Sequence, residues 1–266
     1  NMATIGQIDL ISRQMESSVR ESIDKMEKMI LLEMDRVVLK GDFLEQAAKK
    51  LGLSAVISEL MELNPAPADK QTAIASLFAG VSMPDLLEIA DEIPLMPGIR
   101  TLVGKLKKSG YAVGLVAENF SCVADHLKNT VGFDFVLNNQ LKVDNGIITG
   151  EWQPAPWFID LSATETYHKA HMISYIATRY KIPGRNIIYV SDSEQDRTCF
   201  EAAGTGQIFN SGSLSELPGL SVSPRKLIKP AALVLPLLMA ASAGVLAYTL
   251  LKEVQSAIKK PAVQAG

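Results

Sequence analysis

The stretch that decides the fold is MILLEMDRVVL, residues 29–39, in which an apolar run ends in two acidic residues, Glu33 and Asp35. A second apolar run, IIYVSDSEQD at residues 187–196, ends in the same way with Asp192 and then Asp196. Short apolar runs of this kind predict buried strands. An open α/β sheet binds ligands beyond the carboxyl ends of its strands, and carboxylates there suit Mg²⁺ and its phosphate ligands. The pattern therefore predicts such a site where the two runs end.

Predicted strands and helices alternate along the chain. Strands are expected at residues 111–117 and 133–139, helices at 120–132 and 168–180, and a hairpin at 141–152. This alternation predicts a mostly parallel sheet that is covered on both faces, which is a Rossmann-like α/β core. Residues 42–93 contain no convincing strand and predict a small helical cap inserted after the first strand.

The predicted domain boundaries follow from these patterns. The expected parts are an N-terminal amphipathic helix (1–28), an α/β core (29–41 and 94–210), a cap (42–93), a linker (211–229), a transmembrane helix (230–251) and a tail (252–266). The apolar stripe of the N-terminal helix fits a coiled-coil or oligomer contact and equally fits packing on its own domain.

The C-terminal apolar run predicts a single membrane span. Residues 230–251 are 22 residues without a charge, which is long enough to cross a hydrocarbon core of about 30 Å. A buried helix of a soluble protein is the alternative. No signal peptide is visible in residues 1–28, so the α/β domain is expected in the cytoplasm. Small residues within the span suggest self-association or a place in a membrane protein complex.

Composition excludes some classes of function. Hydrophobic residues make up 47 % of the chain, which supports a real core, and the formal net charge of −3 makes nucleic acid an unsuitable partner. The two cysteines form neither a metal motif nor a disulfide framework.

The order of these parts resembles the haloacid dehalogenase superfamily, in particular its phosphoserine-phosphatase-like branch. The similarity covers about residues 29–210 and is strongest at residues 106–151, LKKSGYAVGLVAENFSCVADHLKNTVGFDFVLNNQLKVDNGIITGE. The family has four motifs: D-x-D-x-T after a strand, a strand ending in Ser-Gly-Gly, a lysine that opens a helix, and G-D-x-x-x-D. They correspond here to Glu33–Val37, Ala117-Glu118-Asn119, Lys169 and Ser191–Asp196.

The resemblance implies a role for each matching residue. It places Glu33 at the nucleophile position, Asp35 at the acid–base position and Lys169 as the phosphoryl clamp. The implied substrate-binding positions are Arg36, Asp42, Ala117, Glu118 and Asn119, and the implied Mg²⁺ ligands are Glu33, Asp35, Asp192 and Asp196.

The departures from the family motifs affect catalysis directly. Glu33 replaces an aspartate and reaches about 1.5 Å further, and a misplacement of about 1 Å can cost about 10²-fold in rate. Ala117 lacks the phosphate-binding hydroxyl, and Glu118 puts a negative charge where a glycine stands in the family. Arg36 is interpreted either as a compensating phosphate clamp or as a group that fills the site.

Several retained residues also have structural explanations. Lys169 is equally explained by an ion pair with Glu33, Asp192 by a turn cap, and Asp42 by a helix N-cap. The leading hypothesis is a membrane-anchored pseudophosphatase that binds or scaffolds partners, in which Mg²⁺ binding is either retained or lost. The alternative is a divergent Mg²⁺-dependent phosphomonoester phosphatase. Phosphoserine is a poor substrate candidate, because no basic residue was found in QTAIASLFAG of the cap.

Overall fold

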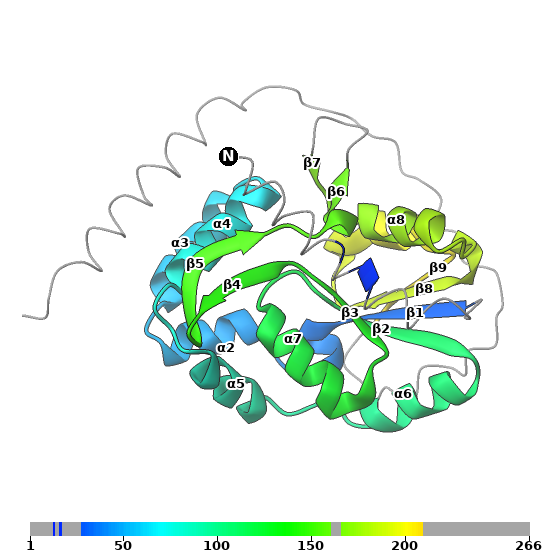
Figure 1. The fold of residues 1–266 in the computed structure, drawn as a ribbon, viewed down its shortest axis with the longest axis horizontal. Helices are drawn as coiled ribbons and strands as arrows, with labels where there is room; N and C mark the ends of the chain where they lie inside the picture. The colour runs from blue at the N-terminus through cyan, green and yellow to red at the C-terminus, as the bar shows by residue number, and fades with distance from the viewer. Residues whose placement is uncertain (1–12, 14–15, 18–27, 161–165, 210–266) are drawn as a thin grey trace, which may run out of the picture.

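The computed structural model describes residue 13 and residues 16–17, 28–160 and 166–209 of the chain. Its central sheet has five parallel strands in the order β3-β2-β1-β8-β9 (Figure 1). Their bounds are β1 Lys28–Glu33, β2 Tyr111–Ala117, β3 Phe135–Asn138, β8 Ile187–Ser191 and β9 Thr205–Ile208. The parallel sheet confirms the expected α/β core.

Both faces of β1 are apolar because both are covered by helices. Ile30 and Leu32 belong to one hydrophobic core, and Met29 and Leu31 belong to the other. Helices α6 (Ile99–Lys108) and α7 (Ser121–Leu127) lie on the first face, and α8 (His171–Arg179) and α9 (Arg197–Ala202) on the second (Figure 1). Two-sided burial explains why these strands are continuous apolar runs without polar alternation.

The centre of the sheet is packed too closely to admit a side chain on Gly114 of β2. A Cβ atom there would lie 2.5 Å from the Phe135 ring and 2.9 Å from the Leu31 side chain. Gly114 therefore lets Phe135 lie flat against the strands that carry the site residues.

Four helices form a cap at one end of the sheet, between β1 and α6 in sequence (Figure 1). They are α2 Phe43–Lys50, α3 Ser54–Leu63, α4 Pro67–Leu77 and α5 Met83–Glu92. The antiparallel hairpin of β4 (Gln140–Asp144) and β5 (Ile147–Gln153) turns at Asn145 and Gly146, which both have positive φ.

The hairpin makes its backbone contacts with the cap. The N–H of Gly80 donates to Ile148 O at 2.8 Å, and the N–H of Ile148 donates to Val81 O at 2.9 Å. The expected boundaries place the hairpin in the core (94–210), but these contacts join it to the cap. A further two-stranded ladder, β6 (Ile159–Asp160) with β7 (Thr166–Tyr167), was not expected from the sequence.

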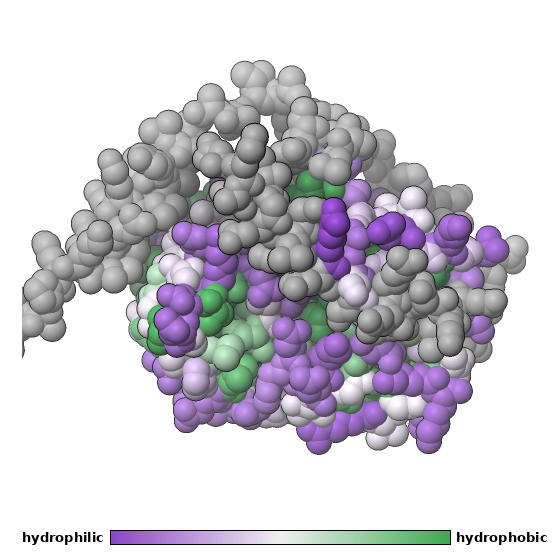
Figure 2. Space-filling model, in the orientation of Figure 1, coloured by the Kyte–Doolittle hydropathy of each residue, from purple (hydrophilic) through white to green (hydrophobic). Residues whose placement is uncertain are grey.

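Apolar side chains gather on the visible face over the cap and the hairpin (Figure 2). The large hydrophobic residues that are exposed in this part of the chain are Met61, Leu63, Val143 and Ile147. The rest of this face is mainly hydrophilic, as expected for helices that cover a sheet.

Several predicted segments lie largely outside the described residues. Of the N-terminal helix (1–28), residues 13, 16 and 17 are helical, and Glu16 forms an ion pair with Arg179 of α8 at 3.0 Å. The linker (211–229), the predicted span (230–251) and the tail (252–266) lie beyond the described part. Within that part, every helix is too short or too polar to cross a membrane.

Candidate active site

The ends of three neighbouring parallel strands bring the predicted residues together. Glu33 closes β1, Glu118 follows β2, and Asp192 follows β8, which lies beside β1. Because the strands are parallel, their carboxyl ends meet at one edge of the sheet. Lys169 reaches the same edge from the turn just before α8.

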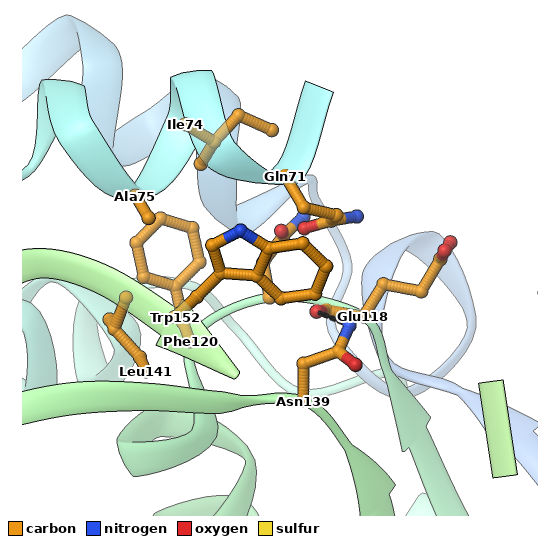
Figure 3. Close-up of a pocket in the computed structure, with 9 residues that line it drawn as sticks. Gln71, Ile74, Ala75, Glu118, Phe120, Asn139, Leu141 and Trp152 are labelled. Atoms are coloured by element: carbon orange, nitrogen blue, oxygen red, sulfur yellow. Dashed lines mark hydrogen bonds between the residues drawn. The ribbon is translucent and has the colours of Figure 1, made fainter. Parts of the chain in front are cut away.

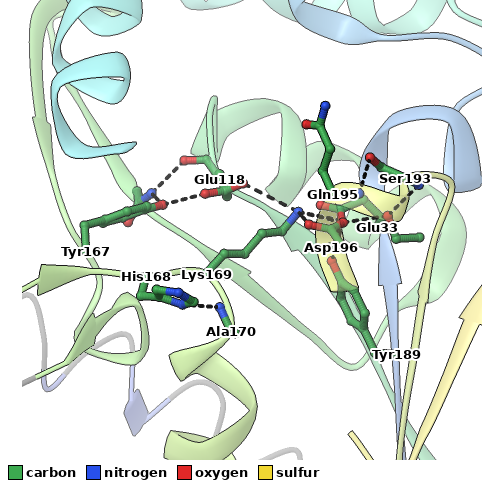
Figure 4. Close-up of polar contacts among 12 residues, drawn as sticks. Glu33, Glu118, Tyr167, His168, Lys169, Ala170, Tyr189, Ser193, Gln195 and Asp196 are labelled. Atoms are coloured by element: carbon green, nitrogen blue, oxygen red, sulfur yellow. Dashed lines mark hydrogen bonds and ion pairs between the residues drawn. The ribbon is translucent and has the colours of Figure 1, made fainter. Parts of the chain in front are cut away.

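The Lys169 ammonium holds together three acidic side chains, and these four residues are called the Lys169 cluster (Figure 4). Lys169 Nζ lies 2.7 Å from Glu33 Oε2, 3.0 Å from Asp196 Oδ1 and 3.5 Å from Glu118 Oε2. The Lys169 side chain is 19 % exposed, and those of Glu33 and Asp196 are each 12 % exposed. The predicted pairing of Glu33 with Lys169 is therefore present as a close contact.

Hydroxyl groups complete the Lys169 cluster. Tyr189 OH donates to Glu33 Oε2 at 2.5 Å and lies 3.1 Å from Asp196 Oδ2, and Ser191 Oγ donates to the same Asp196 oxygen at 2.6 Å. Tyr189 lies in β8, which pairs in parallel with β1, and the sequence did not mark it as a site residue. Its hydroxyl reaches Glu33 because the two strands are neighbours.

Burial and the neighbouring acid Asp196 disfavour the charged form of Glu33. Burial raises the pKa of Glu33 to about 8, and the neighbouring Asp196 adds to the rise, although the charge of Lys169 opposes it. Burial also opposes the charge of Lys169, but Glu33 and the other nearby acids raise its pKa well above its usual value. Glu33 therefore holds a proton near neutral pH while Lys169 stays charged.

Asp35 lies apart from the Lys169 cluster and faces the cap. Its Oδ1 accepts from the N–H of Phe43, the first residue of α2, at 2.7 Å. Burial and then the charge of Asp42 raise the pKa of Asp35 to about 7, against the effect of the Phe43 hydrogen bond. A carboxyl group with this pKa suits a general acid or base at neutral pH.

Arg36 gathers a second group of acids. Its guanidinium lies 3.5 Å from Asp42, 3.5 Å from Glu45 and 3.8 Å from Asp192. Asp42 also accepts from the N–H of Glu45 at 2.9 Å, so it is the N-cap of α2 as the structural explanation predicted. The turn after β8 is capped by a serine, not by Asp192, so that alternative explanation for Asp192 was wrong.

The second motif places an acid beside Lys169. Ala117 is buried at the end of β2 and offers no hydroxyl. Glu118 Oε1 accepts from Tyr167 OH at 3.0 Å, and Asn139 Nδ2 donates to Glu118 O and to Tyr167 OH at 2.8 Å each. Tyr167 precedes His168 and Lys169 in the sequence, but no periodic pattern marked it or Asn139 as site residues.

A small pocket opens between the cap and the sheet edge (Figure 3). Trp152 of β5 faces Gln71 and Ile74 of α4 across it. The other lining residues are Ala75, Glu118, Asn119, Phe120, Asn139 and Leu141. Among the described residues that line the pocket, none is basic, so it presents no cation to a ligand carboxylate.

The four predicted Mg²⁺ ligands do not converge in this arrangement. Within residues 28–160 and 166–209, no three acidic, His or Cys side chains are grouped so that they could hold a metal ion. Glu33 and Asp196 contact Lys169, whereas Asp192 contacts Arg36 and Asp35 accepts a backbone hydrogen bond. Their oxygens suit Mg²⁺ chemically, but in these positions they do not fit the ion.

Comparison with known proteins agrees with this geometry. The model of the haloacid dehalogenase-like hydrolase family matches residues 30–201. A phosphoserine phosphatase of Archaeoglobus fulgidus is 29 % identical over 212 residues, covering 78 % of this chain and 60 % of the relative. Phosphoserine phosphatase SerB2 of Mycobacterium tuberculosis is 26 % identical over 206 residues, covering 75 % of this chain and 48 % of the relative. The chain thus spans about half to three fifths of these relatives.

A solved structure shares the fold. A phosphoserine phosphatase with a phospho-aspartyl intermediate analogue has a TM-score of 0.56 at 20 % identity, over 68 % of this chain and 86 % of that one. The family match, the parallel sheet and the Lys169 cluster at its carboxyl edge lead to one conclusion. The chain belongs to the haloacid dehalogenase-like hydrolase family.

Proposed function

We propose that this chain is a phosphomonoester hydrolase of the phosphoserine-phosphatase type, with Glu33 at the position of the attacking carboxylate. The observation that carries the proposal is the contact of Lys169 with Glu33 at the end of β1, at 2.7 Å. Asp35 follows two residues later with a pKa raised to about 7, principally by burial. The names of the curated relatives support hydrolysis over a purely structural role.

The reaction needs two groups in opposite protonation states. A Glu33 oxygen attacks phosphorus, the bond from phosphorus to the ester oxygen breaks, and Asp35 gives that oxygen a proton. Asp35 then takes a proton from a water molecule whose oxygen attacks the phosphorus of the glutamyl-phosphate, which releases phosphate and restores the Glu33 carboxylate and the protonated Asp35. Lys169 orients the attacking oxygen and offsets the charge of the phosphoryl group.

The pKa values predict slow turnover. Glu33 must be ionised with a pKa near 8, while Asp35 must be protonated with a pKa near 7, both raised mainly by burial. Because the group that must be ionised has the higher pKa, only a minority of molecules carry both groups in the required form at any pH. The proposal therefore predicts a bell-shaped pH profile with its maximum between the two values.

The pocket disfavours phosphoserine as the substrate. The described lining residues offer aromatic rings and amide groups but no cation for a substrate carboxylate. Burying an unpaired carboxylate costs several kcal/mol. We therefore expect uncharged or apolar phosphomonoesters to be hydrolysed in preference to phosphoserine.

A binding subunit without turnover is the second candidate function. Ala117 lacks a hydroxyl for phosphate, and Glu118 brings a carboxylate within 3.5 Å of Lys169. Such a subunit would recognise partners through its cap or through the predicted membrane span, 230–251. The exposed apolar side chains over the cap and the hairpin support this candidate.

One assay separates the two candidates. The full chain is tested against a panel of phosphomonoesters beside Asp35→Asn and beside Asp69→Asn, which removes an exposed acid of α4 as a matched control. Hydrolysis is expected to survive in the control and to fall at least about 10²-fold in Asp35→Asn. An unmodified protein that hydrolyses no ester would end the first candidate. Ester binding without hydrolysis would support the second.

A further inference from the structure

Glu118 has no role in the phosphatase chemistry, yet it is held firmly at the site. Its Oε2 lies 3.5 Å from Lys169 Nζ, and its Oε1 accepts from Tyr167 OH at 3.0 Å (Figure 4). The side-chain amide of Asn139 donates to the backbone O of Glu118 and to Tyr167 OH, at 2.8 Å each, and so holds both residues of this contact in place. The Glu118 side chain is 24 % exposed, so its carboxylate lies between the pocket and the Lys169 cluster.

The Lys169 ammonium has three hydrogen-bond donors, and acidic side chains surround it. Glu33 at the end of β1 and Asp196 in the 3-10 turn Glu194–Asp196 after β8 accept two of its hydrogen bonds. Glu118, which contacts the ammonium at 3.5 Å, also lines the pocket. A phosphate oxygen that binds Lys169 from the pocket therefore meets the Glu118 carboxylate.

We propose that Glu118 is an internal anion that competes with phosphate for Lys169 and so sets the affinity of the site for phosphorylated ligands. The carboxylate already neutralises part of the ammonium charge, and two negative groups about 4 Å apart repel strongly in a partly buried site. Tyr167 keeps Glu118 in the competing position. The proposal rests on the proposed function in taking Lys169 as the phosphate-binding group, but it does not require turnover.

The test measures binding of inorganic phosphate to the full chain by calorimetry. Glu118→Gln keeps the shape and the hydrogen bond with Tyr167 but removes the charge. Glu151→Gln is the matched control, because it removes an exposed acid paired with Lys142 on the hairpin. Both substitutions are repeated in a Lys169→Gln background, where competition for the ammonium no longer exists.

Glu118→Gln is expected to bind phosphate at least about tenfold more tightly than the unmodified chain and the control. This gain should vanish in the Lys169→Gln background, which a general effect of net charge would not explain. Equal affinity, a gain that persists without Lys169, or no phosphate binding by Glu118→Gln would each overturn the proposal.

A second variant covers the case in which Glu118→Gln fails to fold. Tyr167→Phe leaves every charge in place but releases Glu118 from its hydrogen bond, so phosphate affinity should rise by about threefold. Unchanged affinity in this variant would contradict the proposal. Hydrolysis is scored separately: tighter phosphate binding without turnover retains the role of Glu118 and removes the phosphatase proposal. Turnover with no gain in phosphate binding retains the phosphatase proposal and removes the role of Glu118.

Discussion

Replacing Glu33 by glutamine should remove most of the dependence of stability on pH that arises in the Lys169 cluster. Burial raises the pKa of Glu33 from 4.5 to about 8, so the folded protein holds a proton that the unfolded chain releases. A raised pKa of this kind stabilises the fold fully below the unfolded value, and the stabilisation is lost as pH rises through about 8. Glutamine keeps the shape of the protonated carboxyl group and cannot lose a proton.

The size of the effect follows from the two pKa values. A group with an unfolded pKa of 4.5 and a folded pKa of about 8 contributes about 4 kcal/mol at about pH 5 and almost nothing at about pH 9. Asp35 also has a raised pKa, but it titrates in both proteins and largely cancels from the difference. The free energy of unfolding of Glu33→Gln, relative to that of the unmodified protein, should therefore rise by a few kcal/mol from about pH 5 to about pH 9.

Urea unfolding of both proteins at intervals from about pH 5 to about pH 9 measures this difference. Glu59→Gln, an exposed acid on α3, is the matched control and should follow the unmodified protein at every pH. If Glu33→Gln also follows the unmodified protein, Glu33 is ionised throughout and forms an ordinary ion pair with Lys169. That outcome would refute the argument that burial keeps a proton on Glu33.

Three further predictions concern the sheet, the site and the membrane. Gly114→Ala should lower the free energy of unfolding, measured by urea titration, by about 2 kcal/mol or more, because its Cβ would lie 2.5 Å from the Phe135 ring. Gly104→Ala is the control: it lies in open space on α6, and the substitution should be neutral or stabilising in the same titration. Tyr189→Phe should lower the stability, measured by thermal unfolding, by about 1–3 kcal/mol, because it removes the hydroxyl that contacts two acids of the Lys169 cluster. A smaller loss of stability would show that the hydroxyl is not needed. The full chain should resist carbonate extraction from membranes and become extractable when residues 230–251 are removed; extraction of the full chain would contradict the predicted span.

The sequence by itself determined the architecture and most of the site. Apolar runs ending in Glu33 and Asp192 predicted neighbouring strands, and β1 and β8 are indeed paired in parallel. Two-sided burial leaves a local signal in the sequence, since the central residues of β1, Met29–Leu32, are all apolar and buried. The motif positions likewise placed Lys169 and Glu118 at the same edge, where they are 3.5 Å apart.

Only the tertiary structure decided how the charges are paired. The hairpin is continuous with the core in sequence, yet it bonds to the cap, because hydrogen bonds between distant segments leave no periodic pattern. No sequence pattern marked Tyr189, and its hydroxyl contacts Glu33 only because β1 and β8 are neighbours in the fold. The resemblance also implied that Glu33, Asp35, Asp192 and Asp196 are ligands of one ion. The fold pairs Glu33 and Asp196 with a lysine and Asp192 with an arginine, because the distances that choose among oppositely charged partners exist only in the folded chain.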